Sequence, residues 1–93
     1  MTYDFITSAN SKVIVCTTPE GKEKFLLSCQ VTGGANGGII KFEVGNHFAE
    51  YSIAADNTAR IPLPRTLSAG KSLSFTADAN GMAVCICTYD VEV

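Results

Sequence analysis

The C-terminal stretch, Gly81 to Val93, limits the fold more than any other part of the sequence. In an extended strand, successive side chains point to opposite faces. Both faces of this stretch would be apolar as far as Cys87. One face carries Met82, Val84 and Ile86, and the other carries Ala83, Cys85, Cys87, Tyr89 and Val91. Because such a strand must be covered on two sides, it predicts a two-sheet sandwich and favours association with another subunit.

Length and composition support a single domain over residues 1–93 with a lightly charged surface. Charged residues make up 17% of the chain, against about 25% in a typical domain. The net charge of -2 and the lack of a basic block argue against a nucleic-acid partner. No apolar run approaches the ~20 residues that span a bilayer, and the N-terminus resembles no export signal, so we expect synthesis in a cytoplasm and reduced thiols.

Short alternating segments follow one another along the chain, with glycine, proline and asparagine between them. They predict an all-β fold without helices, an antiparallel, jelly-roll-like β-sandwich of about eight short strands. The expected strands are Tyr3–Thr7, Lys12–Thr18, Lys24–Val31, Ile39–Val44, His47–Ala54, Ala59–Leu63, Leu73–Ala77 and Val84–Thr88.

Several strands carry more detailed predictions. The β-branched run Lys12–Thr18 is expected inside a sheet, and Tyr3–Thr7 at an edge. In Lys24–Val31 the alternation points Phe25, Leu27, Cys29 and Val31 to the core. An Asn80-Gly81 turn predicts a hairpin from Leu73 to Thr88, in which Val84 and Ile86 face inward. The loop Thr32–Gly38 holds four glycines, which predicts positive φ angles or close contact with a neighbouring backbone.

Cysteine and histidine are the only residues that suggest metal or catalytic chemistry. They are Cys16, Cys29, Cys85, Cys87 and His47. The cysteine spacing is not that of a zinc knuckle, and buried thiols are the commoner role, although a cross-strand disulfide in an oxidising setting stays open. His47 has only Glu43 and Glu50 nearby in sequence, beside a turn. We therefore predict no catalytic residue, no metal site and no cofactor, and hence no enzyme.

Aromatic residues offer one further kind of site. Tyr51, Tyr89, Phe48 and Asn46 could form a sugar-binding patch, since carbohydrate sites on sandwiches stack sugar rings on exposed aromatics. The chain has no tryptophan, and aromatic residues at alternating positions are more often core residues.

The last third of the chain also resembles a known family. The order Ile61–Pro64, Leu67–Gly70, Leu73–Ala77 and Val84–Thr88 is similar to that in the C-terminal part of small β-sandwich virion proteins of tailed bacteriophages. The same order occurs in some carbohydrate-binding jelly rolls. The cysteines of the closing strand depart from the family pattern, and an obvious N-terminal anchoring arm is missing.

This resemblance implies a structural virion protein, a head decoration (cement) subunit that stabilises a phage capsid by non-covalent contacts. The implied partners are the major capsid protein or other virion subunits, with self-association into a homo-oligomer such as a trimer. The implied location is the virion, after synthesis in the host cytoplasm. The alternative is a carbohydrate- or receptor-binding module that uses exposed aromatics and the loop amides of Asn36, Asn46 and Asn57.

Overall fold

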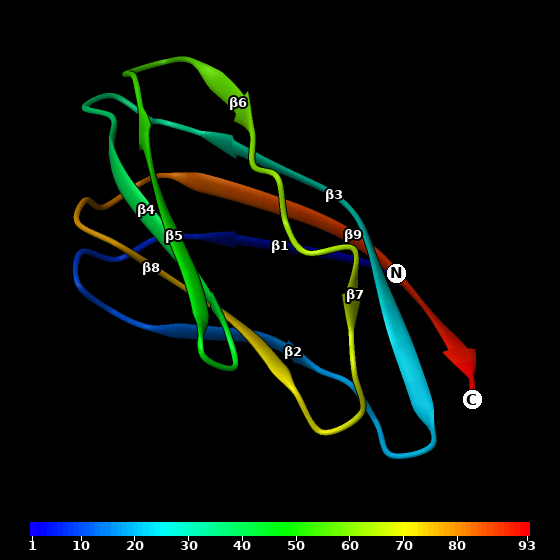
Figure 1. The fold of residues 1–93 in the computed structure, drawn as a ribbon. Coiled ribbons are helices and arrows are strands. Elements are labelled where there is room, and N and C mark those ends of the chain that lie inside the picture. Colours follow the sequence, from blue (N-terminus) through cyan, green and yellow to red (C-terminus); the bar gives the residue numbers. More distant parts are fainter.

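A computed structural model describes residues 1–93 and consists of strands and loops (Figure 1). Its nine strands are β1 (Thr2–Ile6), β2 (Val13–Thr17), β3 (Lys22–Thr32), β4 (Gly38–Val44), β5 (His47–Ile53), β6 (Thr58–Arg60), β7 (Thr66–Leu67), β8 (Ser72–Ala77) and β9 (Ala83–Glu92). The all-β prediction is confirmed. The additional strand is β7, a two-residue segment that no sequence pattern indicated. No helix is long and apolar enough to cross a membrane.

The strands form two antiparallel sheets that pack face to face (Figure 1). Sheet A has the order β1-β9-β3-β6, with β7 also pairing β3, and sheet B has the order β2-β8-β4-β5. The pairing runs from the chain ends inward: β1 pairs with β9, β2 with β8, β3 with β6 and β7, and β4 with β5. One antiparallel ribbon is thus wound so that successive strand pairs alternate between the sheets. This is the jelly-roll arrangement, as predicted.

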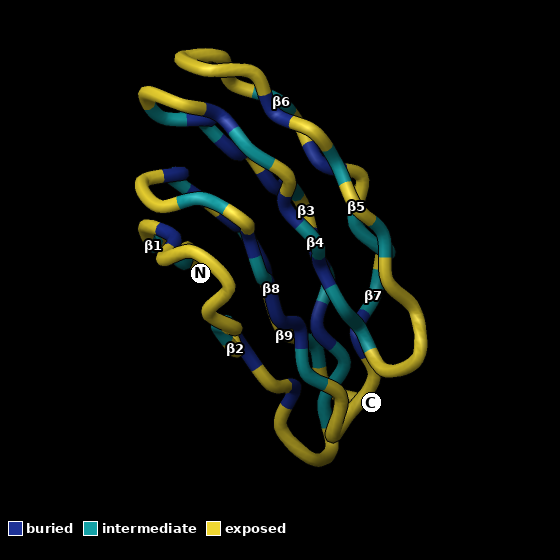
Figure 2. The backbone as a smooth tube through the Cα atoms, turned by 90° about the vertical axis from the view of Figure 1, so that its left-hand side faces the viewer, coloured by how far each residue is buried: buried dark blue, intermediate teal, exposed yellow.

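The hydrophobic core lies between the sheets, and buried positions alternate with exposed ones along the strands (Figure 2). Its largest fully buried side chains are Phe42 of β4 and Phe75 of β8, whose ring centroids lie 6.4 Å apart. From β9, Val84 and Ile86 point into the core and are 2% and 0% exposed. The predicted inward face of the last strand is therefore confirmed.

The predicted hairpin from Leu73 to Thr88 is wrong, because β8 belongs to sheet B and β9 to sheet A. The segment between them crosses from one layer to the other. The end of β1 holds this corner: the Thr7 hydroxyl donates to the Ala79 carbonyl at 2.8 Å and accepts from the Met82 amide at 3.0 Å. Contacts with a distant strand thus override the local turn preference of Asn80-Gly81.

Two β-bulges change the predicted sides of residues. In β3 the register shifts between Leu26 and Ser28, so Leu26 is buried while Leu27 points outward and is 58% exposed. Phe25 also lies on the outer side of the sheet, contrary to the prediction of a core position. The strand β2 is an edge strand rather than an interior one, and its bulge turns Cys16 into the core.

The glycine loop follows the prediction of positive φ angles and close backbone approach. Gly34 and Gly37 have φ angles of 67° and 66°. A side chain at Gly33 would collide with the carbonyl oxygen of Ala54, and one at Gly37 would lie 2.5 Å from the carbonyl oxygen of Ile53. The loop can therefore pack directly on the backbone that follows β5.

Candidate protein-binding face

The side of sheet A that points away from the core, called here the outer face of sheet A, is the most distinctive surface of the molecule. Because the strands are in register, its outward side chains form rows across the sheet. The rows are Ile6-Ala83-Thr32-Thr58, Asp4-Cys85-Gln30-Arg60, Thr2-Cys87-Ser28 and Tyr89-Phe25-Thr66. The middle of the face, on β9 and β3, is uncharged along all four rows.

Large apolar side chains on this face are open to solvent. Ile6 is 63% exposed, Leu27 is 58% exposed and Tyr89 is 44% exposed. The rings of Phe25 and Tyr89 stack on each other with centroids 5.0 Å apart and an interplanar angle of 11°. Clustered exposed apolar groups, unlike single ones, are typical of surfaces that bind another protein.

Charge is confined to the margins of the face. Asp4 lies on the edge strand β1, Arg60 on the opposite edge strand β6, and Glu23 near one end of β3. The outer face of sheet B differs, because Lys12 and Lys41 lie 3.9 Å and 3.6 Å from carboxylate oxygens of Glu43 there. Sheet B also exposes large apolar side chains, those of Ile14, Ile39 and Phe48. Its interior strand β4 carries Lys41 and Glu43, however, whereas the centre of sheet A is uncharged.

A shallow hollow of about 290 Å³ lies within the outer face of sheet A. Small side chains, Ala83 and Cys85, contribute to it from the central strand β9, and Ile6 and Gln30 contribute from the strands on either side. The hollow can receive a side chain of a neighbouring protein.

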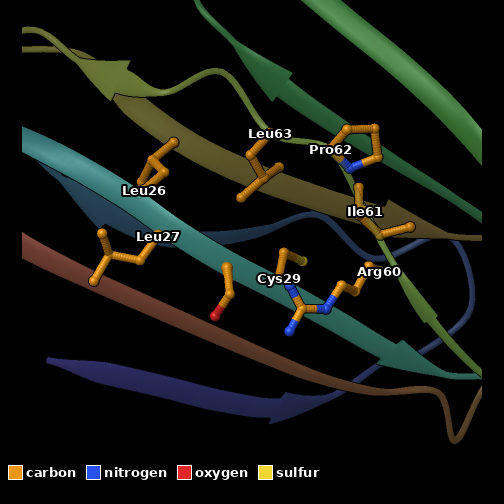
Figure 3. A pocket seen from close by; sticks show the side chains of 8 residues that line it. Leu26, Leu27, Cys29, Arg60, Ile61, Pro62 and Leu63 are labelled. Carbon is orange, nitrogen blue, oxygen red and sulfur yellow. The ribbon is translucent and has the colours of Figure 1, made fainter.

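A second hollow, of about 440 Å³, lies beside it where β6 and β7 separate along the edge of β3 (Figure 3). Pro62 and Pro64 lie in the segment that joins β6 to β7, and proline cannot donate to a β-ladder. Leu27 and Arg60 lie on the side of β3 that belongs to the outer face of sheet A, as Figure 3 shows, so this hollow extends the same surface. The lining of this hollow combines apolar side chains with the guanidinium group of Arg60, so it suits a protein surface that carries both apolar and polar groups.

The four cysteines carry free thiols and are divided between the core and this face. Cys16 and Cys29 are buried, and burial raises the pKa of Cys29 to about 12. Asp4 is the cross-strand neighbour of Cys85, and its carboxylate is the main reason that the pKa of Cys85 is raised. Cys87 contacts the hydroxyl of Thr2 at 3.6 Å.

The fold does not bring together the cysteine and histidine residues that were considered above as metal ligands. His47 begins β5 in sheet B, whereas Cys85 and Cys87 lie on the outer side of sheet A. No group of three or more histidine, cysteine, aspartate or glutamate side chains is close enough together to hold a metal ion. The nearest aromatic ring to His47 is that of Phe42, with centroids 5.9 Å apart.

The residues weighed as a sugar-binding patch lie on different surfaces. Tyr51 packs against the core and stacks on Phe42 with centroids 6.2 Å apart. Phe48 lies on the outer side of sheet B under the ammonium group of Lys41, which is 5.5 Å from the ring centroid. Tyr89 is on sheet A. The structure does not bring these side chains together.

The sequence pattern missed Phe25, Leu27 and Arg60 as members of a surface site. In a regular alternation Phe25 and Leu27 fall on the same side as the core residues Cys29 and Val31. Only the bulge in β3 places both of them on the outer side. For Arg60 a signal existed in the sequence, because the nearby Pro62 and Pro64 cannot donate to a ladder and so favour an edge strand or a bend, and edge strands carry charges that discourage unwanted pairing.

Comparison with family models, with curated proteins and with solved structures finds no match. Fold and surface together define the class: a jelly-roll β-sandwich with a largely uncharged, partly apolar face on one sheet.

Proposed function

We propose that this protein is a structural virion protein, a decoration (cement) subunit that stabilises a phage capsid through non-covalent contacts. The observation that carries the proposal is the outer face of sheet A. Its exposed apolar side chains and uncharged centre are better suited to contact with another protein chain than to water.

Two further points support the proposal. The jelly roll is an architecture that viral capsid proteins use, although lectins use it too and a fold alone does not fix a function. The segments from Ile61 to Thr88 resemble small virion proteins of tailed bacteriophages. A subunit of this kind binds the assembled lattice and not free capsid subunits, so each occupied site adds its binding free energy to the stability of the assembled shell.

The test is binding to capsids that lack their decoration protein. The purified protein is mixed with such capsids, which are pelleted and then heated. Saturable co-sedimentation and a higher temperature of capsid disruption are expected. A protein that stays in the supernatant at every concentration would contradict the proposal, and saturable binding on a glycan array instead would favour the carbohydrate-binding alternative.

A matched pair of variants links this binding to the outer face of sheet A. Ala83→Glu places a carboxylate in the uncharged centre of the face, where burial of an unpaired charge is unfavourable. Capsid binding should weaken at least about tenfold, equivalent to about 1.4 kcal/mol. Ser52→Glu adds the same charge on the exposed side of β5 in sheet B and should leave binding unchanged. Equal effects of both variants would remove the link to this face.

A further inference from the structure

The second of the four rows on the outer face of sheet A has opposite charges at its two ends. Asp4, Cys85, Gln30 and Arg60 are paired in register across the four strands. The acid lies on one edge strand and the base on the other, about 14 Å apart at about 4.8 Å per strand spacing. Both side chains are exposed, and neither forms an ion pair within the chain.

We propose that a second copy of this chain covers the outer face of sheet A, with Arg60 of each copy paired with Asp4 of the other. This inference rests on the proposed function, in which the face contacts the capsid, and adds that the unbound subunit covers the same face with a second copy, so that dimer formation and capsid binding compete. Homodimers most often have two-fold symmetry, in which the same patch serves both copies. A self-complementary charge pattern is what such an interface requires.

The charges also select the direction of the two-fold axis. A two-fold axis that lies between the two facing copies of sheet A and runs parallel to the strands places β1 of one copy over β6 of the other. It likewise places β9 over β3. Asp4 then meets Arg60 at both margins of the interface. An axis perpendicular to the strands would leave each strand over its own counterpart, so that acidic edge meets acidic edge. Like-charge contacts of this kind disfavour the second arrangement.

Side-chain sizes agree with the first arrangement. The central strand β9 presents the small side chains of Ala83 and Cys85, which contribute to the hollow. The neighbouring strand β3 presents Thr32 and Gln30 in the same two rows. With the axis parallel to the strands, Thr32 and Gln30 of one copy lie over the small Ala83 and Cys85 of the other. In the last row Tyr89 of one copy lies over Phe25 of the other, where aromatic rings can stack.

The size of the face sets the expected affinity. The strands β1, β9, β3 and β6 hold 5, 10, 11 and 3 residues, and at about 4.8 Å by 3.4 Å per residue they cover about 470 Å² per copy. The total of about 950 Å² is below the standard size and in the range of weak, reversible contacts. We therefore expect a reversible dimer with a dissociation constant in the micromolar range.

The test is sedimentation velocity in reducing, low-salt buffer, from about 1 μM to about 300 μM, a range that brackets a micromolar Kd. The wild-type chain should pass from monomer to dimer. Asp4→Arg and Arg60→Asp should each raise the Kd at least about tenfold, because each reversal turns two symmetric attractions into repulsions. The double variant, with both reversals, should regain a Kd within about threefold of wild type, since it restores the pairing with the signs exchanged.

Two controls accompany the reversals. Glu50→Arg makes the same charge change as Asp4→Arg on the outer side of sheet B and should leave the Kd within about twofold. A short bis-maleimide added to the wild-type chain should link Cys85 to Cys85 between copies at high concentration and not after dilution. This second measurement uses the native charges, so it remains decisive if a charge variant folds poorly.

A monomer over the whole range, a trimer, or a dimer that ignores all charge reversals would overturn the inference. These results are independent of the capsid experiment, because no capsid is present. A chain that dimerises but fails to bind capsids even well below its Kd, where the face is free, would refute the proposed function alone, and monomers that bind capsids would refute the dimer alone.

Discussion

Loss of the buried ion pair between Lys24 and Asp90 should destabilise the protein by an amount that depends on which partner is removed. Lys24 lies on β3, points between the sheets and is only 3% exposed. Its ammonium nitrogen is 2.6 Å from a carboxylate oxygen of Asp90, its neighbour in register on β9, and 5.9 Å from the ring centroid of Tyr3. The Asp90 side chain is 27% exposed and remains in contact with water.

Asp90→Asn removes the charge that compensates a buried ammonium group. Breaking a buried ion pair in this way costs about 3–5 kcal/mol, and water access around Asp90 lowers the expected value to about 2–3 kcal/mol. Lys24→Met removes the buried charge itself and replaces it with an apolar side chain of similar length. The Asp90 carboxylate can then hydrate, so the expected loss is about 1 kcal/mol or less.

Equilibrium unfolding in urea, followed by circular dichroism, measures both values. Asp90→Asn should be the more destabilising variant by at least about 1 kcal/mol. Equal losses, or a larger loss for Lys24→Met, would show that Lys24 stabilises the sheet through its aliphatic packing and not through its charge.

The same pair predicts a pH dependence. Burial alone lowers the pKa of Lys24, but the hydrogen bond from Lys24 to Asp90 and the nearby charges of Asp90, Tyr3 and Cys16 outweigh it, so the net pKa lies above the ordinary value of 10.5. Because the pKa is higher in the folded state, the contribution to stability is complete below pH 10.5 and is lost as the pH rises through the folded value. The stability difference between wild type and Asp90→Asn should therefore shrink in strongly alkaline buffer.

Three further measurements test the packing. Ile86→Ala should cost about 2–4 kcal/mol in urea unfolding, whereas Cys85→Ala, on the opposite face of the same strand, should stay within about 0.5 kcal/mol; equal losses would contradict the assigned faces. Gly33→Ala should cost about 2 kcal/mol or more, because its Cβ would overlap the Ala54 carbonyl, and Gly70→Ala, in open space at φ 78°, only about 1 kcal/mol. In the native monomer only the two cysteines of β9 should react with a thiol reagent, and all four after unfolding.

The sequence was sufficient to predict the fold class because its evidence is local. Alternation of apolar and polar residues at short intervals, with turn residues between, defines strands whatever their partners are. The inward sides of β4 and β8 were also predictable, because Phe42 and Phe75 lie in regular alternations that no bulge interrupts. Even the jelly roll followed from the number and spacing of the strands.

What could not be predicted depends on partners far away in the sequence. The inward position of Lys24 is tolerable only because Asp90, 66 positions later, supplies a counter-charge. The bulge that turns Leu27 outward occurs within the long pairing of β3 with β9. The charged row of the candidate face needs four strands in register, so no window of the sequence contains both Asp4 and Arg60.

The position of β9 explains why residues 1–93 leave the candidate face uncovered. As the last strand of the ribbon, β9 pairs with β1 on one side and β3 on the other, so its outward side chains occupy the centre of sheet A and not an edge. The jelly roll has only two layers, and the whole chain is used in forming them. Small groups such as the Cys85 thiol tolerate water, but Ile6 and Tyr89, in the first and last rows of the same face, expose much larger apolar areas. No segment among residues 1–93 covers that surface, and in the proposed dimer the second copy removes it from water.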